Sequence, residues 1–122
     1  MKTGIYNAGA CGIEQIIYLG TITHEAGTES TKLEGALPEG FKLTRIVIDV
    51  REAFTASTTL NLGDGTTAAK YASAKNVATA GVLYEDKFED VGDKPVDVYA
   101  ALSAEATDGS ADIYAYVAKL DV

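Results

Sequence analysis

The stretch FKLTRIVIDV, residues 41–50, decides the fold class of this chain. Ile46, Ile48 and Val50 would share one side of an extended strand, and Val47 would point to the other side. β-branched residues of this kind suit a pleated sheet better than a helix. Because apolar residues point to both sides, we expect a strand whose two faces are both at least partly covered.

Shorter segments with strand chemistry lie on both sides of this stretch. They cover residues 14–23, 32–36, 58–62, 81–88, 96–102 and 111–120. Turn signals separate them, among them the dipeptide Asp108-Gly109, which predicts a hairpin between the last two segments. Seven or eight short strands at this spacing predict an all-β domain, either a sandwich or a barrel.

The segment 63–80 is ambiguous. Gly63-Asp64-Gly65 predicts a sharp turn, because glycine permits positive φ and aspartate can cap its own turn. We expect the chain to leave its sheet there and to cross one end of the domain over residues 66–80. The alanines of this segment also allow a short helix around residues 67–75, whereas its Thr and Ser content favours irregular structure.

Length and charge limit the possible roles. The chain has 122 residues, enough for one domain, which we place at residues 13–122 after a Gly/Ala-rich arm at 1–12. It carries 10 Lys and Arg against 18 Asp and Glu, a net charge of −8. Nucleic acids and anionic membranes attract basic surfaces, so the sequence disfavours both as partners.

The N-terminal residues MKTGIYN lack the apolar core of a signal peptide, and no apolar run is long enough to span a bilayer. We therefore expect a soluble protein that is made in the cytosol. Cys11 is the single cysteine, so no intramolecular disulfide can form. One Cys and one His cannot complete a structural zinc site, and we expect no metal or other cofactor.

No group of residues suggests catalysis, and we expect a protein that is not an enzyme. His24, followed by Glu25, could serve as a base, but the sequence favours an exposed loop histidine. The carboxylates Glu85, Asp86, Glu89 and Asp90 could include an acid–base pair, but interleaved Lys87 favours a solvated charged strand end. Asp64 could contribute to a surface calcium site, although the full ligand pattern of a calcium loop is missing.

Tyrosines are the candidates for partner contact, because their rings are apolar and their hydroxyls polar. Tyr114 and Tyr116 would project from one face of the last strand, and Tyr6 lies in the N-terminal arm. The face with Tyr114 and Tyr116 is either an inner sandwich face or a protein-binding patch, and the sequence leaves both open.

One stretch resembles a known family. FTASTTLNLGDG at 54–65, continued by AAKY at 68–71 and VATAGV at 77–82, resembles small virion proteins of tailed phages and prophages, including capsid decoration proteins. Lys70 matches a basic residue before the family's aromatic position, and 111–117 echoes its closing strand. The resemblance covers roughly residues 41–120 as a pattern of short motifs.

The resemblance implies a jelly-roll-like β-sandwich without an active site. It implies a location in the virion and contact with the outside of the capsid, hence with the major capsid protein. Decoration proteins of this kind often act as trimers or dimers, so self-association on the particle is expected. The alternative is a receptor- or carbohydrate-binding module of a tail fibre, with aromatic residues gathered at one exposed loop end.

Overall fold

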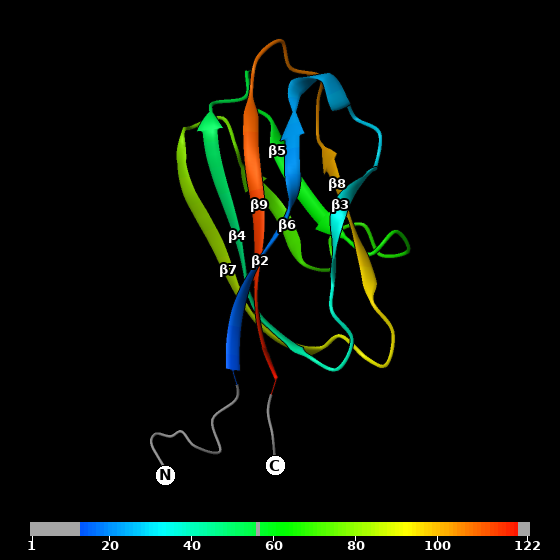
Figure 1. Cartoon of the computed structure of the whole chain (residues 1–122). Helices are drawn as coiled ribbons and strands as arrows, with labels where there is room; N and C mark the ends of the chain where they lie inside the picture. Colours follow the sequence, from blue (N-terminus) through cyan, green and yellow to red (C-terminus); the bar gives the residue numbers. More distant parts are fainter. Residues whose placement is uncertain (1–12, 56, 120–122) are drawn as a thin grey trace.

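Two antiparallel four-stranded sheets pack against each other in the computed structural model, which describes residues 13–55 and 57–119 (Figure 1). One sheet has the order β2-β9-β4-β7 and the other β3-β8-β5-β6. The strands are β2 Ile13–Thr23, β3 Thr31–Leu37, β4 Lys42–Glu52, β5 Thr59–Gly63, β6 Ala72–Asn76, β7 Gly81–Asp90, β8 Val96–Leu102 and β9 Ser110–Lys119. The predicted all-β sandwich is therefore confirmed.

The strand pairs are nested along the chain. β2 pairs with β9, β3 with β8, β4 with β7, and β5 with β6, always antiparallel. β9 also pairs with β4, and β8 with β5, which joins the pairs into the two sheets. Only the β5–β6 connection stays within one sheet, so every other loop between strands crosses from one layer to the other.

The core fills the space between the sheets. Alternation brings Ile46, Ile48 and Val50 of β4 inward, where they are at most 2 % exposed. The other sheet contributes residues such as Leu60, Leu62, Val98 and Leu102, and Phe54 closes the core near the loop after β4. Buried Ile113, Ala115 and Val117 show that the inward side of β9 is aliphatic and carries no tyrosine.

The two open sides of the sandwich are closed differently. Beside β2 and β3 the backbones approach closely, since a Cβ on Gly35 would lie 2.8 Å from the Tyr18 carbonyl oxygen. Beside β6 and β7, the Lys75 ammonium of β6 pairs with the Glu85 carboxylate of β7 at 2.9 Å. Backbone contact thus closes one side, and charged side chains bridge the other.

The short helix that the sequence allowed around residues 67–75 does not form. Residues 66–71 form turns, and Ala72–Asn76 forms strand β6, which pairs with β5. Sheet pairing overrides the helical preference of alanine here, because Leu60 pairs with Lys75 and Leu62 with Ala72. The Ala74 amide also donates to the Asn61 side-chain oxygen at 2.7 Å. The chain consequently returns to the same sheet after Gly63 instead of leaving it. The described residues contain no helix long and apolar enough to cross a membrane.

The hairpin predicted at Asp108-Gly109 is also wrong. β8 and β9 belong to different sheets, so the loop between them crosses the end of the sandwich. The Thr55 amide donates to the Asp108 carbonyl at 3.3 Å, and a Cβ on Gly109 would lie 2.4 Å from the Phe54 ring. Glycine is therefore needed for close packing of this loop on the core.

Candidate partner-binding surface

The outer surface of the β2-β9-β4-β7 sheet carries large apolar side chains in contact with water. The exposed large hydrophobic residues of the described chain are Ile16, Tyr18, Val82, Tyr84 and Phe88, all on the edge strands β2 and β7. Half-buried Val47 of β4 and Tyr114 and Tyr116 of β9 lie between these edges. We call the surface formed by these side chains the tyrosine face.

Strand register places four of these side chains in one row across the sheet. Tyr18 is opposite Tyr114, Tyr114 is opposite Val47, and Val47 is opposite Tyr84. Neighbouring strands lie about 4.8 Å apart, so the row spans roughly 14 Å. The rings of Tyr18 and Tyr114 are tilted, with centroids 5.5 Å apart. The row is therefore a continuous ridge of aromatic and aliphatic surface.

A chain of hydrogen bonds fixes one end of this ridge. The Thr21 hydroxyl donates to Asp112 Oδ1 at 2.6 Å and also contacts the Tyr18 hydroxyl. Because the single Thr21 hydroxyl proton goes to Asp112, Tyr18 is the donor to Thr21. Asp112 Oδ2 accepts from Arg51 at 2.9 Å. The Thr21 hydroxyl, followed by Arg51, lowers the pKa of the Asp112 carboxyl, which keeps the network ionised.

Basic residues on this surface stack on its rings. The guanidinium of Arg45 lies 4.7 Å from the centroid of the Tyr84 ring and pairs with Asp86 at 2.6 Å. Lys42 lies 4.7 Å from the centroid of Phe88 and pairs with Asp90 at 3.0 Å. Cations thus already bind aromatic rings of the tyrosine face within the chain itself.

A shallow hollow opens beside the row. It encloses about 230 Å³ and is lined by Glu14, Thr44, Arg45, Asp86 and Tyr116. The Thr44 hydroxyl lies 3.3 Å from Glu14 Oε2 and 3.1 Å from the carbonyl oxygen of Tyr116. In the part of the chain that the structure describes, Glu14 forms no ion pair.

The outer surface of the other sheet is polar. Register and alternation place Lys32, Glu34, Asn61, Asp97, Tyr99 and Ala101 on it, and we call this surface the polar face. Lys32 and Asp97 form an exposed ion pair at 3.6 Å.

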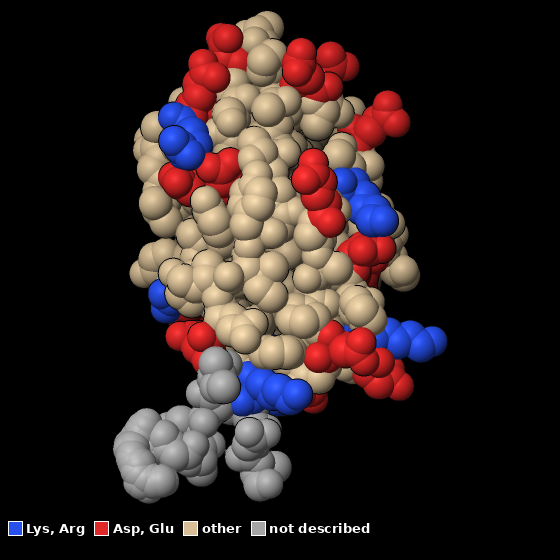
Figure 2. Space-filling view, viewed as in Figure 1, with Lys and Arg blue, Asp and Glu red and all other residues tan. Residues whose placement is uncertain are grey.

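Figure 2, viewed as Figure 1, shows uncharged surface running down the middle over β9 and β2, with acidic and basic side chains mostly around it.

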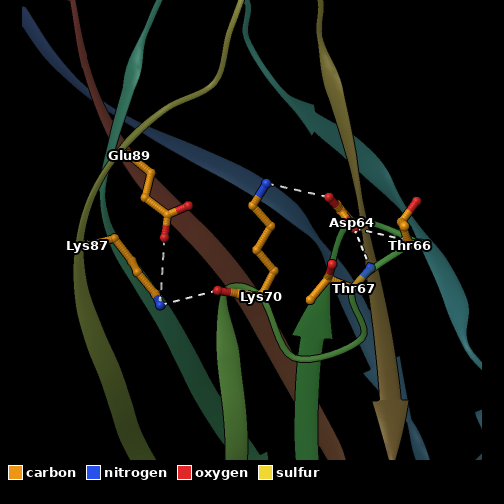
Figure 3. Close-up of polar contacts among 6 residues, drawn as sticks. All are labelled: Asp64, Thr66, Thr67, Lys70, Lys87 and Glu89. Atoms are coloured by element: carbon orange, nitrogen blue, oxygen red, sulfur yellow. Dashed lines mark hydrogen bonds and ion pairs between the residues drawn. The ribbon is translucent and has the colours of Figure 1, made fainter.

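The loop after β5 is built around Asp64 (Figure 3). Asp64 Oδ1 accepts from the amides of Thr66 and Thr67 at 2.9 and 2.7 Å, and Oδ2 lies 3.5 Å from Lys70 Nζ. The two amides, with Thr67 the stronger, lower the pKa of Asp64. Because both oxygens of the Asp64 carboxylate already have partners in the loop, the side chain stabilises the turn. The described part of the chain has no group of three or more His, Cys, Asp or Glu placed to hold a metal ion.

Both glycines of this turn are required by close contacts. A Cβ on Gly63 would lie 2.1 Å from the Thr67 carbonyl oxygen. Gly65 has φ of +91°, and a Cβ there would lie 2.8 Å from the Tyr99 ring. Tyr71, which follows the loop, is buried, and desolvation together with the Asp64 and Glu89 charges raises its pKa to about 12. The turn is thus a tightly packed structural unit.

Charged residues of the acidic run 85–90 form ion pairs and a hydrogen bond that join β7 to β6 and to the loop before it, and we call this set of contacts the charged seam. Glu85 and Glu89 point inward and pair with Lys87 at 3.1 and 3.9 Å. Lys87 also donates to the Lys70 carbonyl at 3.2 Å, so it ties β7 to the loop before β6 (Figure 3). Bonding to Lys75 and Lys87 lowers the pKa of Glu85, which makes it a poor proton donor near neutral pH.

The other catalytic candidates lie apart from this seam. His24 and Glu25 are in the 3-10 helix η1, His24–Ala26, at the end of β2. The His24 amide donates to the Gly109 carbonyl at 3.1 Å, while its ring Nδ1 is buried without a hydrogen-bond partner among the described residues. This histidine packs against the β8–β9 loop, in a different place from the acidic run.

The structure answers the question that the sequence left open for β9. Tyr114 and Tyr116 lie on the outer side, because Ile113, Ala115 and Val117 occupy the core. Tyr6 and the predicted arm at 1–12 lie outside the described residues. The sequence analysis did not select five other residues as candidates: Ile16, Tyr18, Val82, Tyr84 and Phe88. Each lies in a predicted strand, and the alternation of side chains along that strand could have placed it on the outer face.

Comparison with known proteins gives structural matches only. No protein-family model matches the chain, and no curated protein sequence matches it. A chain of a structure titled "Cyanophage Pam1 capsid asymmetric unit" aligns over 97 % of this chain and 93 % of its own length, with a TM-score of 0.71 and 20 % identity.

A second match is a chain of the acid-stable capsid structure of Helicobacter pylori bacteriophage KHP30. It covers 89 % of this chain and 95 % of its own length, with a TM-score of 0.58 and 15 % identity. At these identities the matches show a shared fold. Since each alignment covers nearly all of both chains, the matched chains are about as long as this one.

Proposed function

We propose that this protein is a structural component of a tailed-phage virion, and that it acts as a capsid decoration, or cement, protein. It binds the outer capsid surface through the tyrosine face and stabilises the shell. One observation carries the proposal: a sandwich fold found in chains of two phage capsid structures leaves an aromatic sheet face uncovered. The role is one of binding and requires no catalysis.

Interface chemistry supports this use of the tyrosine face. Tyrosine is enriched in protein interfaces and among the residues that dominate their binding energy. Contiguous apolar surface on a small domain commonly marks a binding site. The flanking ion pairs and hydroxyls supply the polar rim that surrounds such sites. Each copy needs to bury only a modest area, because many copies on a symmetric shell add their effects.

The nested strand pairing also fits the proposal. We interpret it as a jelly-roll wrapping, in which eight strands form two Greek keys across two sheets. The partner that we propose is the major capsid protein, with trimers or dimers of this chain forming on the particle. We further propose that residues 1–12, including Tyr6, reach a neighbouring subunit.

The direct test uses capsids that lack this protein. We expect the purified chain to co-sediment with them and to raise the temperature at which they disrupt. Deleting residues 2–12 should weaken binding while leaving the far-UV spectrum and the unfolding midpoint of the domain unchanged. If the chain does not co-sediment with these capsids and does not raise their disruption temperature, the cement role is refuted.

The rival function is a carbohydrate- or receptor-binding module of a tail fibre. Exposed tyrosine rings can stack on sugars, and this property favours the carbohydrate-binding alternative. It predicted aromatic residues at one loop end, whereas the exposed aromatic rings Tyr18, Tyr84 and Phe88 lie along strands of a sheet face. Strong binding on a glycan array, lost on replacing Tyr18 and Tyr84, would support the rival; an array without binding would remove it.

A further inference from the structure

The tyrosine face is short of positive charge. Its carboxylates include Glu14, Asp49, Asp86, Asp90 and Asp112. The cations Lys42, Arg45 and Arg51 each pair with one of the last three, whereas Glu14 and Asp49 form no ion pair among the described residues. The surface therefore favours a partner that supplies positive charge.

The hollow beside Glu14, of about 230 Å³, carries groups that suit a cationic side chain. It is lined by Glu14, Thr44 and Tyr116 and by the Arg45–Asp86 ion pair, in which the two charges offset each other. Strand register sets exposed Ile16 directly opposite Tyr116, so apolar surface adjoins the hollow. A guanidinium can pair with a carboxylate and lie on an aromatic ring at the same time, as Arg45 does with Asp86 and Tyr84 on this surface.

We infer that this hollow is an anchor site for an arginine side chain on a basic protein surface, which the tyrosine face contacts. This inference rests on the proposed function in taking the partner to be a protein of the particle, and it adds the chemistry of recognition. Tyr116 and Ile16 contact the aliphatic and planar parts of the arginine, and Glu14 neutralises its charge. The apolar row beside the hollow then packs against the surface around that arginine.

Charge argues against a second copy of this chain as the occupant. Two tyrosine faces in contact would bring together the Glu14 and Asp49 carboxylates of both copies, which form no ion pair among the described residues. The whole chain carries a net charge of −8, which adds long-range repulsion between free copies. A basic partner removes both penalties.

The first experiment probes the site without any capsid. A blocked hexa-arginine peptide is titrated into the isotope-labelled protein, and NMR shifts are followed residue by residue. We expect the largest shifts at Glu14, Ile16, Thr44 and Tyr116, and about threefold to tenfold weaker binding for Glu14→Gln. Glu34→Gln on the polar face removes the same charge from another exposed strand position and should leave the affinity nearly unchanged.

Several outcomes would overturn the inference. One is a set of NMR shifts spread evenly over all acidic residues, and another is an equal loss of peptide affinity for Glu14→Gln and Glu34→Gln. A third is a shift at Ile16 and Tyr116 that depends on protein concentration without peptide, which would reveal self-association. A hexa-glutamate peptide that shifts the same residues equally would also contradict it.

The second experiment separates this inference from the proposed function. Capsids lacking the protein are mixed with wild-type, Glu14→Gln and Glu34→Gln chains at several NaCl concentrations, and the bound fraction is measured by sedimentation. If hexa-arginine binds the hollow but wild type never binds capsids, the cement role fails and the anchor site stands. If wild type binds capsids and Glu14→Gln binds equally well at every salt concentration, the cement role stands and the anchor site fails.

Discussion

The tyrosine face and the polar face belong to sheets of equal strand number in one sandwich, yet they differ in the side chains that meet water. The polar face presents Lys32, Glu34 and Asp97, and its one aromatic ring, Tyr99, packs beside Gly65. The tyrosine face leaves Phe88 67 % exposed and Val82 62 % exposed. Folding does not require such exposure, because the polar face closes the same core without it.

The different exposed side chains of the two faces show which residues the fold needs and which it does not. Both sheets fill the core with aliphatic side chains on their inner faces. Exposed apolar surface adds nothing to that core and makes a free protein more prone to association. Its confinement to one face therefore argues for a partner on that side, and variants on the two faces should have separable effects.

The largest expected effect is on binding. Replacing Tyr18 and Tyr84, at the two ends of the row, with alanine should weaken capsid binding by about 4 kcal/mol, or roughly 700-fold in Kd, at about 2 kcal/mol for each interface tyrosine. Both side chains are more than half exposed, so the free energy of unfolding should change little. Sedimentation with capsids measures the first quantity and urea denaturation the second.

Tyr99→Ala is the matched control on the polar face. It removes the same side chain from the other sheet and should leave capsid binding intact. If Tyr99→Ala weakens binding as much as the double variant, the two faces do not differ in function.

The next effect is on stability and belongs to the sheet of the polar face. Gly63→Ala should lower the free energy of unfolding by about 3 kcal/mol, because the added Cβ meets the backbone of residues 67 and 68 and cannot turn away. Gly92→Ala is the control: it has φ of +105° but open space, so strain alone should cost about 1 kcal/mol. Equal losses at both positions would show that loop contact contributes nothing.

The same loop shows where sequence reasoning reached its limit. Residues 72–76, ASAKN, have neither β-branched nor aromatic side chains, so nothing local marks β6 as a strand. Its pairing with β5 and the bond from Ala74 to Asn61 hold it there. The Asp108-Gly109 hairpin failed for a similar reason, because long-range pairing with β2 and β4 takes β9 into the other sheet.

The tyrosine face was only partly predictable from the sequence. Alternation placed Tyr114 and Tyr116 on one side of a strand but could not say whether that side was the core. The two-sided apolar pattern of residues 46–50 predicted partial cover on both faces of β4. In the structure, Val47 is half-buried between Tyr114 and Tyr84, so its cover comes from the tyrosine row itself. The row depends on the register of four strands relative to one another, and this register cannot be predicted from any one strand segment alone.

A smaller effect is expected at the charged seam between β6 and β7. Lys87→Met should lower the free energy of unfolding by about 1 to 2 kcal/mol, because Glu85, Glu89 and the Lys70 carbonyl lose a largely buried partner. Lys32→Met on the polar face breaks one exposed ion pair and should cost less than about 0.5 kcal/mol. Urea denaturation at neutral pH compares them, and equal losses would contradict a structural role for the seam.

The smallest effect is the pH response of the hydrogen-bond chain at the end of the tyrosine row. Folding lowers the pKa of Asp112, first through the Thr21 hydroxyl and then through Arg51. Its contribution to stability is therefore present above the unfolded pKa of about 3.9 and is lost as the pH falls through the lower folded value. Asp112→Asn should cost about 1 kcal/mol at pH 7 and progressively less below about pH 4, because the wild-type carboxylate is then protonated as well. Thr21→Val should reduce the same pH dependence in part while leaving Arg51 paired with Asp112. Urea denaturation from pH 7 to pH 3 measures the differences between the chains, and a constant gap between wild type and Asp112→Asn would mean that the lowered pKa of Asp112 contributes nothing to stability.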